Sequence, residues 1–184
     1  KMFCPKKPAD ERITKSMPWL RTCRKILGIG GYSKMSRTGA QILEPVRFED
    51  FRGEFIETWS ALSMPDISWR RDNLSISHRG VLRGIHGSPS TIKLVSCIAG
   101  TAYVVVVAPD RGAVENFILS ERNRRRLLVP AECGLGYYAI TDVVYSYKQS
   151  TDYGQEDEFT WKWNDPELGI FWPCVDPILS ERDR

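Results

Sequence analysis

Short segments of apolar or alternating residues, separated by turn-forming residues, run through the chain from residue 41 onward. Such alternation is typical of strands with one buried face, because successive side chains of a strand point to opposite faces of the sheet. The pattern predicts nine strands, over residues 55–59, 81–85, 93–99, 103–108, 116–119, 126–129, 136–140, 143–148 and 158–163. Their spacing of about 8–12 residues, with no long amphipathic helix between them, predicts an all-β, antiparallel sandwich or barrel.

One predicted strand is apolar throughout. Residues 103–107 read Tyr-Val-Val-Val-Val, which is too rich in β-branched residues for a helix. The run is also far shorter than the roughly 18 apolar residues that a membrane-spanning helix needs. We therefore expect a strand that is covered on both faces. The chain also lacks the apolar core of a secretory signal, so we expect a cytoplasmic protein with no membrane partner.

Basic residues concentrate in the first fifth of the chain. The formal net charge is +3, but residues 1–37 carry ten Lys or Arg against two acidic residues, and residues 38–184 carry sixteen against twenty-one. Residues 1–37 also contain three prolines and a Gly-Ile-Gly-Gly run. We expect a flexible leader over 1–37, with a short helix at 18–27, followed by one domain over 38–184. Met35 is the expected natural start of the protein.

The cysteine and histidine content limits the possible metal chemistry. Five cysteines, an odd number at no metal-like spacing, predict neither a disulfide framework nor a zinc site. His78 and His86 are the only histidines, and His78 stands beside Arg79 in a predicted turn, where we expect it to be exposed. A metal centre would have to use both histidines and recruit carboxylates, so we expect no bound metal.

Residues 71–77 carry polar side chains that a scaffold alone would not need. The segment reads Arg-Asp-Asn-Leu-Ser-Ile-Ser. If it is extended, Asn73, Ser75 and Ser77 lie on one face. Polar groups on one face of an inner strand indicate a ligand-binding surface.

The next segment, residues 80–87, reads Gly-Val-Leu-Arg-Gly-Ile-His-Gly. Regular alternation would place Arg83 and His86 on opposite faces of a strand. A bulge at Gly84 or Gly87 would instead redirect the His86 ring. Both arrangements remain open from the sequence.

A series of short motifs extends over residues 42–183. In order they are Phe48-x-Asp50-x-Arg52-Gly53-x-Phe55-x-Glu57, Asp72-Asn73-x-Ser75-x-Ser77, Gly80-Val81-Leu82-Arg83-Gly84-Ile85-His86, Lys93-Leu94-Val95, Tyr147-Lys148, Tyr153 with Glu158, Trp163-Asn164-Asp165, Gly169-Ile170-x-Trp172-Pro173 and Leu179-Ser180-x-x-Asp183. Through this order and spacing the chain resembles the dTDP-4-dehydrorhamnose 3,5-epimerase family. The resemblance implies a cupin-type jelly-roll β-barrel with short peripheral helices, and the activity of a nucleotide-sugar epimerase.

The resemblance also implies four catalytic side chains. His86 corresponds to the base that removes a proton beside the ketone of a nucleoside-diphosphate 4-keto-6-deoxy sugar, and an imidazole suits this role because its unperturbed pKa lies near 7. Asp183 corresponds to the residue that orients the imidazole. Lys93 would stabilise the enolate, and Tyr147 would return a proton on the opposite face. The implied reaction needs neither a metal nor a cofactor.

Further positions correspond to the family's binding site for the nucleotide, the diphosphate and the sugar. They are Arg52, Glu57, Arg71, Asp72, Asn73, Arg83, Glu158 and Arg182. The resemblance implies a homodimer that exchanges N-terminal strands, so that Arg52 and Glu57 reach the partner's nucleotide. We expect no nucleic-acid partner, because residues 38–184 are net acidic. Arg122 and residues 124–126 are interpreted as a solvated strand edge that resists edge-to-edge pairing.

The chain departs from the family pattern in two places. Leu135 stands where the family has a substrate-contacting histidine, and the segment between His86 and Lys93 is short, with Gly87 in place of the usual aromatic residue. Because both changes line the sugar site, we expect an altered sugar, or inversion at one carbon instead of two. Two alternatives remain: a catalytically silent nucleotide-sugar binding protein, and an isomerase that moves the ketone between C3 and C4.

Overall fold

Antiparallel strands make up almost all of the regular structure in the residues that the computed structural model describes, which are 36–154 and 157–184. The chain divides into two units. Of the smaller unit the structure describes Trp59–Ile67, a segment of turns in which Met64 and Ile67 are buried. The larger unit comprises the other described residues and contains all the strands. The expected leader helix at 18–27 lies outside the described residues.

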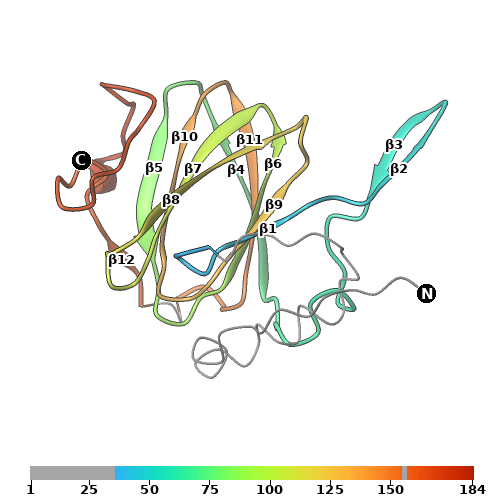
Figure 1. Ribbon diagram of the computed structural model, residues 1–184, viewed down its shortest axis with the longest axis horizontal. Helices are drawn as coiled ribbons and strands as arrows, with labels where there is room; N and C mark the ends of the chain where they lie inside the picture. Colours follow the sequence, from blue (N-terminus) through green and yellow to red (C-terminus); the bar gives the residue numbers. More distant parts are fainter. Residues whose placement is uncertain (1–35, 155–156) are drawn as a thin grey trace, which may run out of the picture. The chain divides into compact units, whose positions relative to one another are not determined.

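Two five-stranded sheets form the body of the larger unit and face each other (Figure 1). The strand order in the first sheet is β1 (Gln41–Leu43), β9 (Arg126–Val129), β6 (Lys93–Ala99), β11 (Val143–Gln149) and β4 (Arg71–Ser77). The order in the second is β12 (Phe159–Thr160), β5 (Leu82–Gly87), β10 (Gly134–Ala139), β7 (Thr101–Val107) and β8 (Val114–Ser120). Neighbouring strands are antiparallel, and most neighbours are distant in sequence, so the chain alternates between the sheets.

Two smaller elements complete the described structure. Strands β2 (Arg47–Asp50) and β3 (Gly53–Ile56) pair with each other in a hairpin that stands away from both sheets (Figure 1). Near the C-terminus, the 3₁₀ turn η1 (Glu181–Asp183) lies beside β5. Across the described part of the chain, no helix is long and apolar enough to span a membrane.

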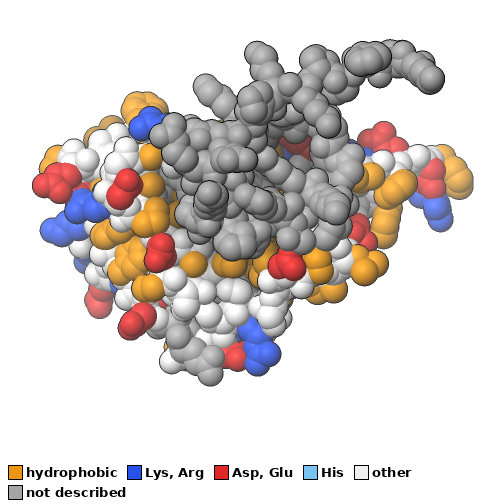
Figure 2. All heavy atoms as spheres, turned by 60° about the horizontal axis from the view of Figure 1, so that its bottom comes forward, with side chains coloured by type: hydrophobic (Ala, Val, Ile, Leu, Met, Phe, Trp, Pro, Cys, Tyr) orange, Lys and Arg blue, Asp and Glu red, His pale blue; other side chains and the backbone are white. Residues whose placement is uncertain are grey.

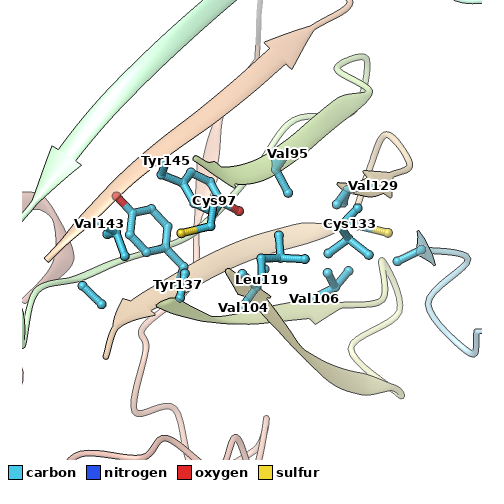
Figure 3. Packing of buried hydrophobic residues seen from close by; sticks show 14 residues of the cluster. Val95, Cys97, Val104, Val106, Leu119, Val129, Cys133, Tyr137, Val143 and Tyr145 are labelled. Carbon is cyan, nitrogen blue, oxygen red and sulfur yellow. The ribbon is translucent and has the colours of Figure 1, made fainter. Parts of the chain in front are cut away.

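The space between the sheets is filled by one apolar cluster, whose packing is shown in Figure 3. Val104 and Val106 of β7 belong to it, whereas Val105 and Val107 belong to a second cluster with Trp172. All four valines are 0% exposed. The prediction of a strand covered on both faces is therefore confirmed, and it explains why this strand shows no alternation.

The strand predictions succeed where apolar side chains are buried. Those for 93–99 and 126–129 match β6 and β9 residue for residue. The prediction for 158–163 is wrong beyond Thr160: the Trp161 backbone still exchanges two hydrogen bonds with Ile85, and the chain then turns, with Asp165 N bonded to the Lys162 carbonyl oxygen. The prediction for 55–59 is wrong beyond Ile56, and β2 was not predicted, because all four residues of β2 are exposed and leave no hydrophobic pattern.

A bulge in β5 brings Arg83 and His86 to the same side of the sheet. His86 is paired with Leu135 and Arg83 with Tyr137, so three steps along β5 correspond to two along β10. Gly84 lies within this bulge at a φ of +110°, a conformation that favours glycine. The bulge that the sequence left open is therefore present, and the strictly alternating arrangement is wrong.

Replacing Gly84 with alanine should be severely disruptive. A Cβ atom there would lie 2.6 Å from both the Gly136 Cα and the Leu135 carbonyl oxygen, and the positive φ would be strained as well. We expect Gly84→Ala to lower the free energy of unfolding by about 1–3 kcal/mol in denaturant titrations. Gly169→Ala is the matched control, because Gly169 has a positive φ but open space around it. Equal losses in both variants would show that close packing at Gly84 is unimportant.

Candidate active site

A cavity of about 840 Å³ is lined by strands of both sheets and by the C-terminal segment. All four predicted catalytic residues line it: His86 from β5, Lys93 from β6, Tyr147 from β11 and Asp183 from η1. The predicted binding residues that also line it are Arg71, Arg83, Glu158 and Arg182. A smaller hollow of about 310 Å³, near the loop that contains Trp163 and Trp172, holds none of the predicted site residues.

His86 and Asp183 form a close pair although 97 positions separate them in the sequence. The His86 Nε2 atom lies 2.6 Å from Asp183 Oδ1. The other carboxylate oxygen of Asp183 accepts a hydrogen bond from the Ser180 hydroxyl at 3.0 Å, and the Asp183 side chain is 3% exposed. The imidazole is therefore held in one orientation by a carboxylate that is itself fixed.

The surroundings of His86 favour its neutral form. Burial lowers the pKa of His86 below its ordinary value of 6.5, and the positive charges of Arg182 and Lys93 act in the same direction. The nearby Asp183 carboxylate opposes them and raises the pKa, but the net shift is downward. A neutral imidazole can accept a proton, so the site maintains a base near neutral pH.

A buried cation and a phenol lie in the same cavity. Lys93 is 9% exposed, and its Nζ atom donates to the carbonyl oxygen of His86 at 3.3 Å. Tyr147 is half-buried on β11, where it is paired with Asn73 of β4 and Val95 of β6. His86 and Tyr147 thus come from different sheets, and a ligand in the cavity can have one on each side.

The polar face predicted for residues 71–77 is present, but two of its members bind another side chain. The hydroxyl groups of Ser75 and Ser77 each lie 2.9 Å from the Tyr137 hydroxyl. Ser77 also accepts a hydrogen bond from Arg83 Nε at 2.9 Å. Ser75 and Ser77 therefore position Tyr137 and Arg83 at the wall of the cavity.

Three arginines give the cavity a positive rim. Arg71 extends over the Tyr153 ring, with 5.6 Å between the guanidinium carbon and the ring centroid. Arg182 lies 2.8 Å from a carboxylate oxygen of Glu158, and Arg83 is anchored as described above. Guanidinium groups bind phosphate in a planar, bidentate geometry, so this rim suits an anionic ligand such as a diphosphate.

Four predicted binding residues lie outside the cavity lining. Asp72 faces the opposite side of β4 and pairs with Lys148. Asn73 does not line the cavity itself, but its side-chain amide donates a hydrogen bond to Gln149, which does. Arg52 and Glu57 are exposed, at the tip and base of the β2–β3 hairpin, and Arg52 pairs with Asp50 at 2.6 Å. Within a single chain, the hairpin residues are not part of the cavity.

The structure adds cavity residues that the sequence did not identify. Tyr137 and Tyr145 are stacked with ring centroids 4.2 Å apart (Figure 3), and both line the cavity, as does Gln149. Tyr153, which belongs to the motif series, lines it as well. The alternation of residues 143–148 puts Tyr145 and Tyr147 on one face, which was the one available signal. Leu135, noted from the sequence as a departure, is paired with His86 and forms an apolar part of the wall.

Metal ligands do not gather at this site. Over residues 36–154 and 157–184, no group of three or more His, Cys, Asp or Glu side chains is arranged to hold a metal ion. His78 is exposed, as expected, and lies 3.8 Å from the Asp142 carboxylate, away from the cavity.

Comparison with known proteins gives a consistent family. A sequence model of the family dTDP-4-dehydrorhamnose 3,5-epimerase matches residues 34–184. The dTDP-4-dehydrorhamnose 3,5-epimerase of Streptomyces griseus is 39% identical over 165 residues, which cover 82% of this chain and 82% of that protein.

Solved structures agree with the sequence matches. The dTDP-4-dehydrorhamnose 3,5-epimerase of Bacillus anthracis, with TDP and PPi bound, is similar with a TM-score of 0.76 and 32% identity, over 81% of this chain and 94% of the other. The 3'-monoepimerase ChmJ of Streptomyces bikiniensis, in complex with dTDP-quinovose, is similar with a TM-score of 0.72 and 31% identity, over 79% and 81%. The predicted cupin-type jelly roll is confirmed.

Proposed function

Since the chain belongs to the dTDP-4-dehydrorhamnose 3,5-epimerase family and is an isomerase of nucleotide sugars, we propose that it inverts C3, C5 or both in a nucleoside-diphosphate 4-keto-6-deoxy sugar. The protons on these carbons flank the ketone, so removal of either gives an enolate. Return of a proton to the opposite face inverts the centre. The observation that carries the proposal is that His86 and Tyr147 enter one cavity from different sheets.

In the proposed mechanism His86 removes the proton. Its Nε2 atom is bound by Asp183, so the tautomer with hydrogen on Nε2 is favoured and Nδ1 is left to accept a proton. Asp183 stabilises the imidazolium that forms. Because Asp183 is buried and is also bound by Ser180, the imidazole needs little reorganisation during the reaction.

Lys93 is proposed to stabilise the enolate. Negative charge develops on the ketone oxygen as the proton leaves, and a preorganised cation in a water-poor site acts strongly on such charge. The burial of Lys93 and its hydrogen bond to the His86 carbonyl place it beside the base. Tyr147 then donates its phenolic proton to the carbon and the product leaves as the epimer. His86 releases the proton that it gained to water, and Tyr147 regains one from water, before the next inversion.

The positive rim is proposed to bind the diphosphate. Arg71, Arg83 and Arg182 line the cavity beside the catalytic residues, and the similar Bacillus anthracis enzyme was solved with TDP and PPi bound. We propose that a second copy of this chain completes the site by supplying Arg52 and Glu57 from its hairpin. Exposed apolar side chains on the hairpin, among them Phe48 and Phe55, support such a homodimer.

The rate should fall on acidification with a midpoint below pH 6.5. The proposed mechanism needs neutral His86, and burial lowers its pKa, so the neutral form persists below the ordinary value of 6.5. In Asp183→Asn the group that raises the pKa is lost, so the acid limb should move to still lower pH. Profiles of kcat/KM against pH measure the acid limb of the unmodified protein and that of Asp183→Asn. An acid limb at or above 6.5 in the unmodified protein would contradict this assignment.

Solvent deuterium incorporation tests the function directly. The protein is incubated in D₂O with a dTDP-4-keto-6-deoxyglucose, and NMR follows the C3 and C5 protons. Exchange with inversion at both carbons is expected for a 3,5-epimerase. Exchange at one carbon alone would favour the second candidate, a monoepimerase, for which the apolar Leu135 beside His86 is the supporting observation. Binding without exchange would overturn the proposal.

A further inference from the structure

The β2–β3 hairpin is joined to the body by ion pairs around Glu54, which is paired with Glu49 one step from the turn of the hairpin. One carboxylate oxygen of Glu54 lies 2.9 Å from Arg47, and the other lies 3.2 Å from Arg124. Arg47 belongs to the hairpin, whereas Arg124 lies in the turn between β8 and β9 of the second and first sheets. The side chain of Glu54 is 30% exposed, so water competes less with these pairs than with a freely solvated pair.

The two arginines are also hydrogen-bonded to the backbone of the body. Arg47 donates to the carbonyl oxygen of Arg122 at 2.7 Å, and Arg124 donates to that of Ile98 at 2.9 Å. Each guanidinium therefore joins Glu54 to a fixed backbone group. A network of this kind restrains direction as well as distance, because guanidinium groups are planar and donate along set directions.

The chain is also held where it enters and leaves the hairpin. Arg125 lies 2.8 Å from Glu44, just before β2, and Arg126 donates to the carbonyl oxygen of Thr58 at 2.6 Å, just after β3. The interpretation of residues 124–126 as a solvated strand edge is therefore wrong. Their side chains contact the hairpin and the segments on either side of it, because the β8–β9 turn reaches them.

Large apolar side chains of the hairpin are exposed. Phe48 and Phe55 form a tilted ring pair across the two strands, and Phe51 in the turn is 98% exposed. Figure 2 shows hydrophobic, acidic and basic side chains gathered at the right end of the view, where the hairpin lies. An isolated two-stranded hairpin is marginally stable in water, so its direction depends on how the body holds it.

We infer that Arg124 and Glu54 are positioning residues, which set the angle of the hairpin so that Arg52 and Glu57 reach the nucleotide bound by a second copy of the chain. This inference rests on the proposed function and its homodimer. Glu54 stands on β3 between Arg52 in the turn and Glu57 after the strand, and Arg124 pairs with it from the body, so Arg124 acts through the hairpin without touching substrate. Its loss should weaken nucleotide binding and dimerisation while leaving the His86 chemistry intact.

The experiment compares Glu54→Gln and Arg124→Gln with the unmodified chain. Arg122→Gln is the matched control, because it removes a charge from the same turn while Arg122 meets the hairpin through its carbonyl oxygen. We expect Glu54→Gln and Arg124→Gln to raise KM for the nucleotide sugar and the dimer dissociation constant about three- to tenfold. The kcat of the assembled dimer should change by less than about twofold. Arg124→Lys, which keeps the charge, should restore part of the loss.

Hydrogen exchange of residues 44–58 separates the possible outcomes. Faster exchange in the two variants together with raised KM supports the inference. Faster exchange with unchanged KM and unchanged dimerisation overturns it, as does unchanged exchange. If the unmodified chain turns over no 4-keto sugar, the proposed function fails, whatever the variants do. The positioning role is then tested by dimerisation alone, and it is overturned if the variants and the unmodified chain have the same dimer dissociation constant.

Discussion

Replacing His86 with alanine should abolish most epimerisation. The imidazole is the proposed base, and positioned general bases contribute roughly 10²–10⁴-fold to a rate. We expect kcat for a 4-keto nucleotide sugar to fall by about this factor and solvent deuterium incorporation to fall in parallel. Substrate affinity should change little, because the diphosphate would bind Arg71, Arg83 and Arg182. Stopped assays followed by NMR measure the rate, and calorimetry measures substrate binding. Together they distinguish loss of the base from loss of binding.

His78 provides the matched control for this variant. It is the other histidine of the chain, and it lies on the surface near Asp142. His78→Ala should leave both rate and deuterium incorporation unchanged. If His86→Ala kept more than about a tenth of the activity, His86 would not be the base.

Substitution of Asp183 should reduce activity less than substitution of its partner His86. It does not exchange protons with the substrate in the proposed mechanism, but holds His86 through the 2.6 Å contact to Nε2. A mispositioned imidazole can still accept a proton, less effectively, so Asp183→Asn should retain more activity than His86→Ala. The pairing also anchors the C-terminal segment against β5, because Asp183 lies in η1.

The fold was predictable as far as burial leaves a pattern. β6 directs Val95 and Cys97 toward the core, β9 is a run of three buried apolar residues, and β7 is apolar on both faces, so these elements followed from residue type alone. The hairpin could not be found in this way. Its residues are exposed in a single chain, and a strand without a buried face has no hydrophobic period.

The site was predictable to a different degree. Alternation located the polar face of β4, yet it could not reveal that Ser75 and Ser77 bind the Tyr137 hydroxyl, because that contact depends on how the two sheets face each other. The proximity of His86 to Asp183 is likewise a product of tertiary structure. The family resemblance supplied it, since the spacing of 97 residues contains no local signal.

The bulge at Gly84 links the fold to the chemistry. Without the extra residue in β5, Arg83 and His86 would lie on opposite faces, and the proposed diphosphate and base subsites could not share one cavity. Glycine meets this need because it alone adopts the required φ easily and leaves room for the β10 backbone. A residue with no functional group thus decides where the functional groups point.

Replacing Tyr147 with phenylalanine should separate proton removal from inversion. His86 and Lys93 remain, so the enolate still forms, but the proposed donor on the opposite face is lost. The His86 imidazolium exchanges the proton that it removed with D₂O, and it can return a deuteron only to the face from which that proton came. We therefore expect solvent deuterium to enter the substrate with retained configuration, while formation of the epimer falls by roughly 10²-fold or more. NMR of the recovered sugar measures exchange and inversion in one sample.

Tyr145→Phe is the matched control for the Tyr147 variant. Tyr145 lies two positions earlier on the same face of β11, and its buried hydroxyl finds no hydrogen-bond partner in the described part of the chain. Removing that hydroxyl breaks no hydrogen bond, so stability should be unchanged or slightly raised, and inversion should persist. If Tyr147→Phe lost exchange and inversion to the same extent, Tyr147 would act before or during proton removal, because a donor used only for reprotonation cannot affect enolate formation.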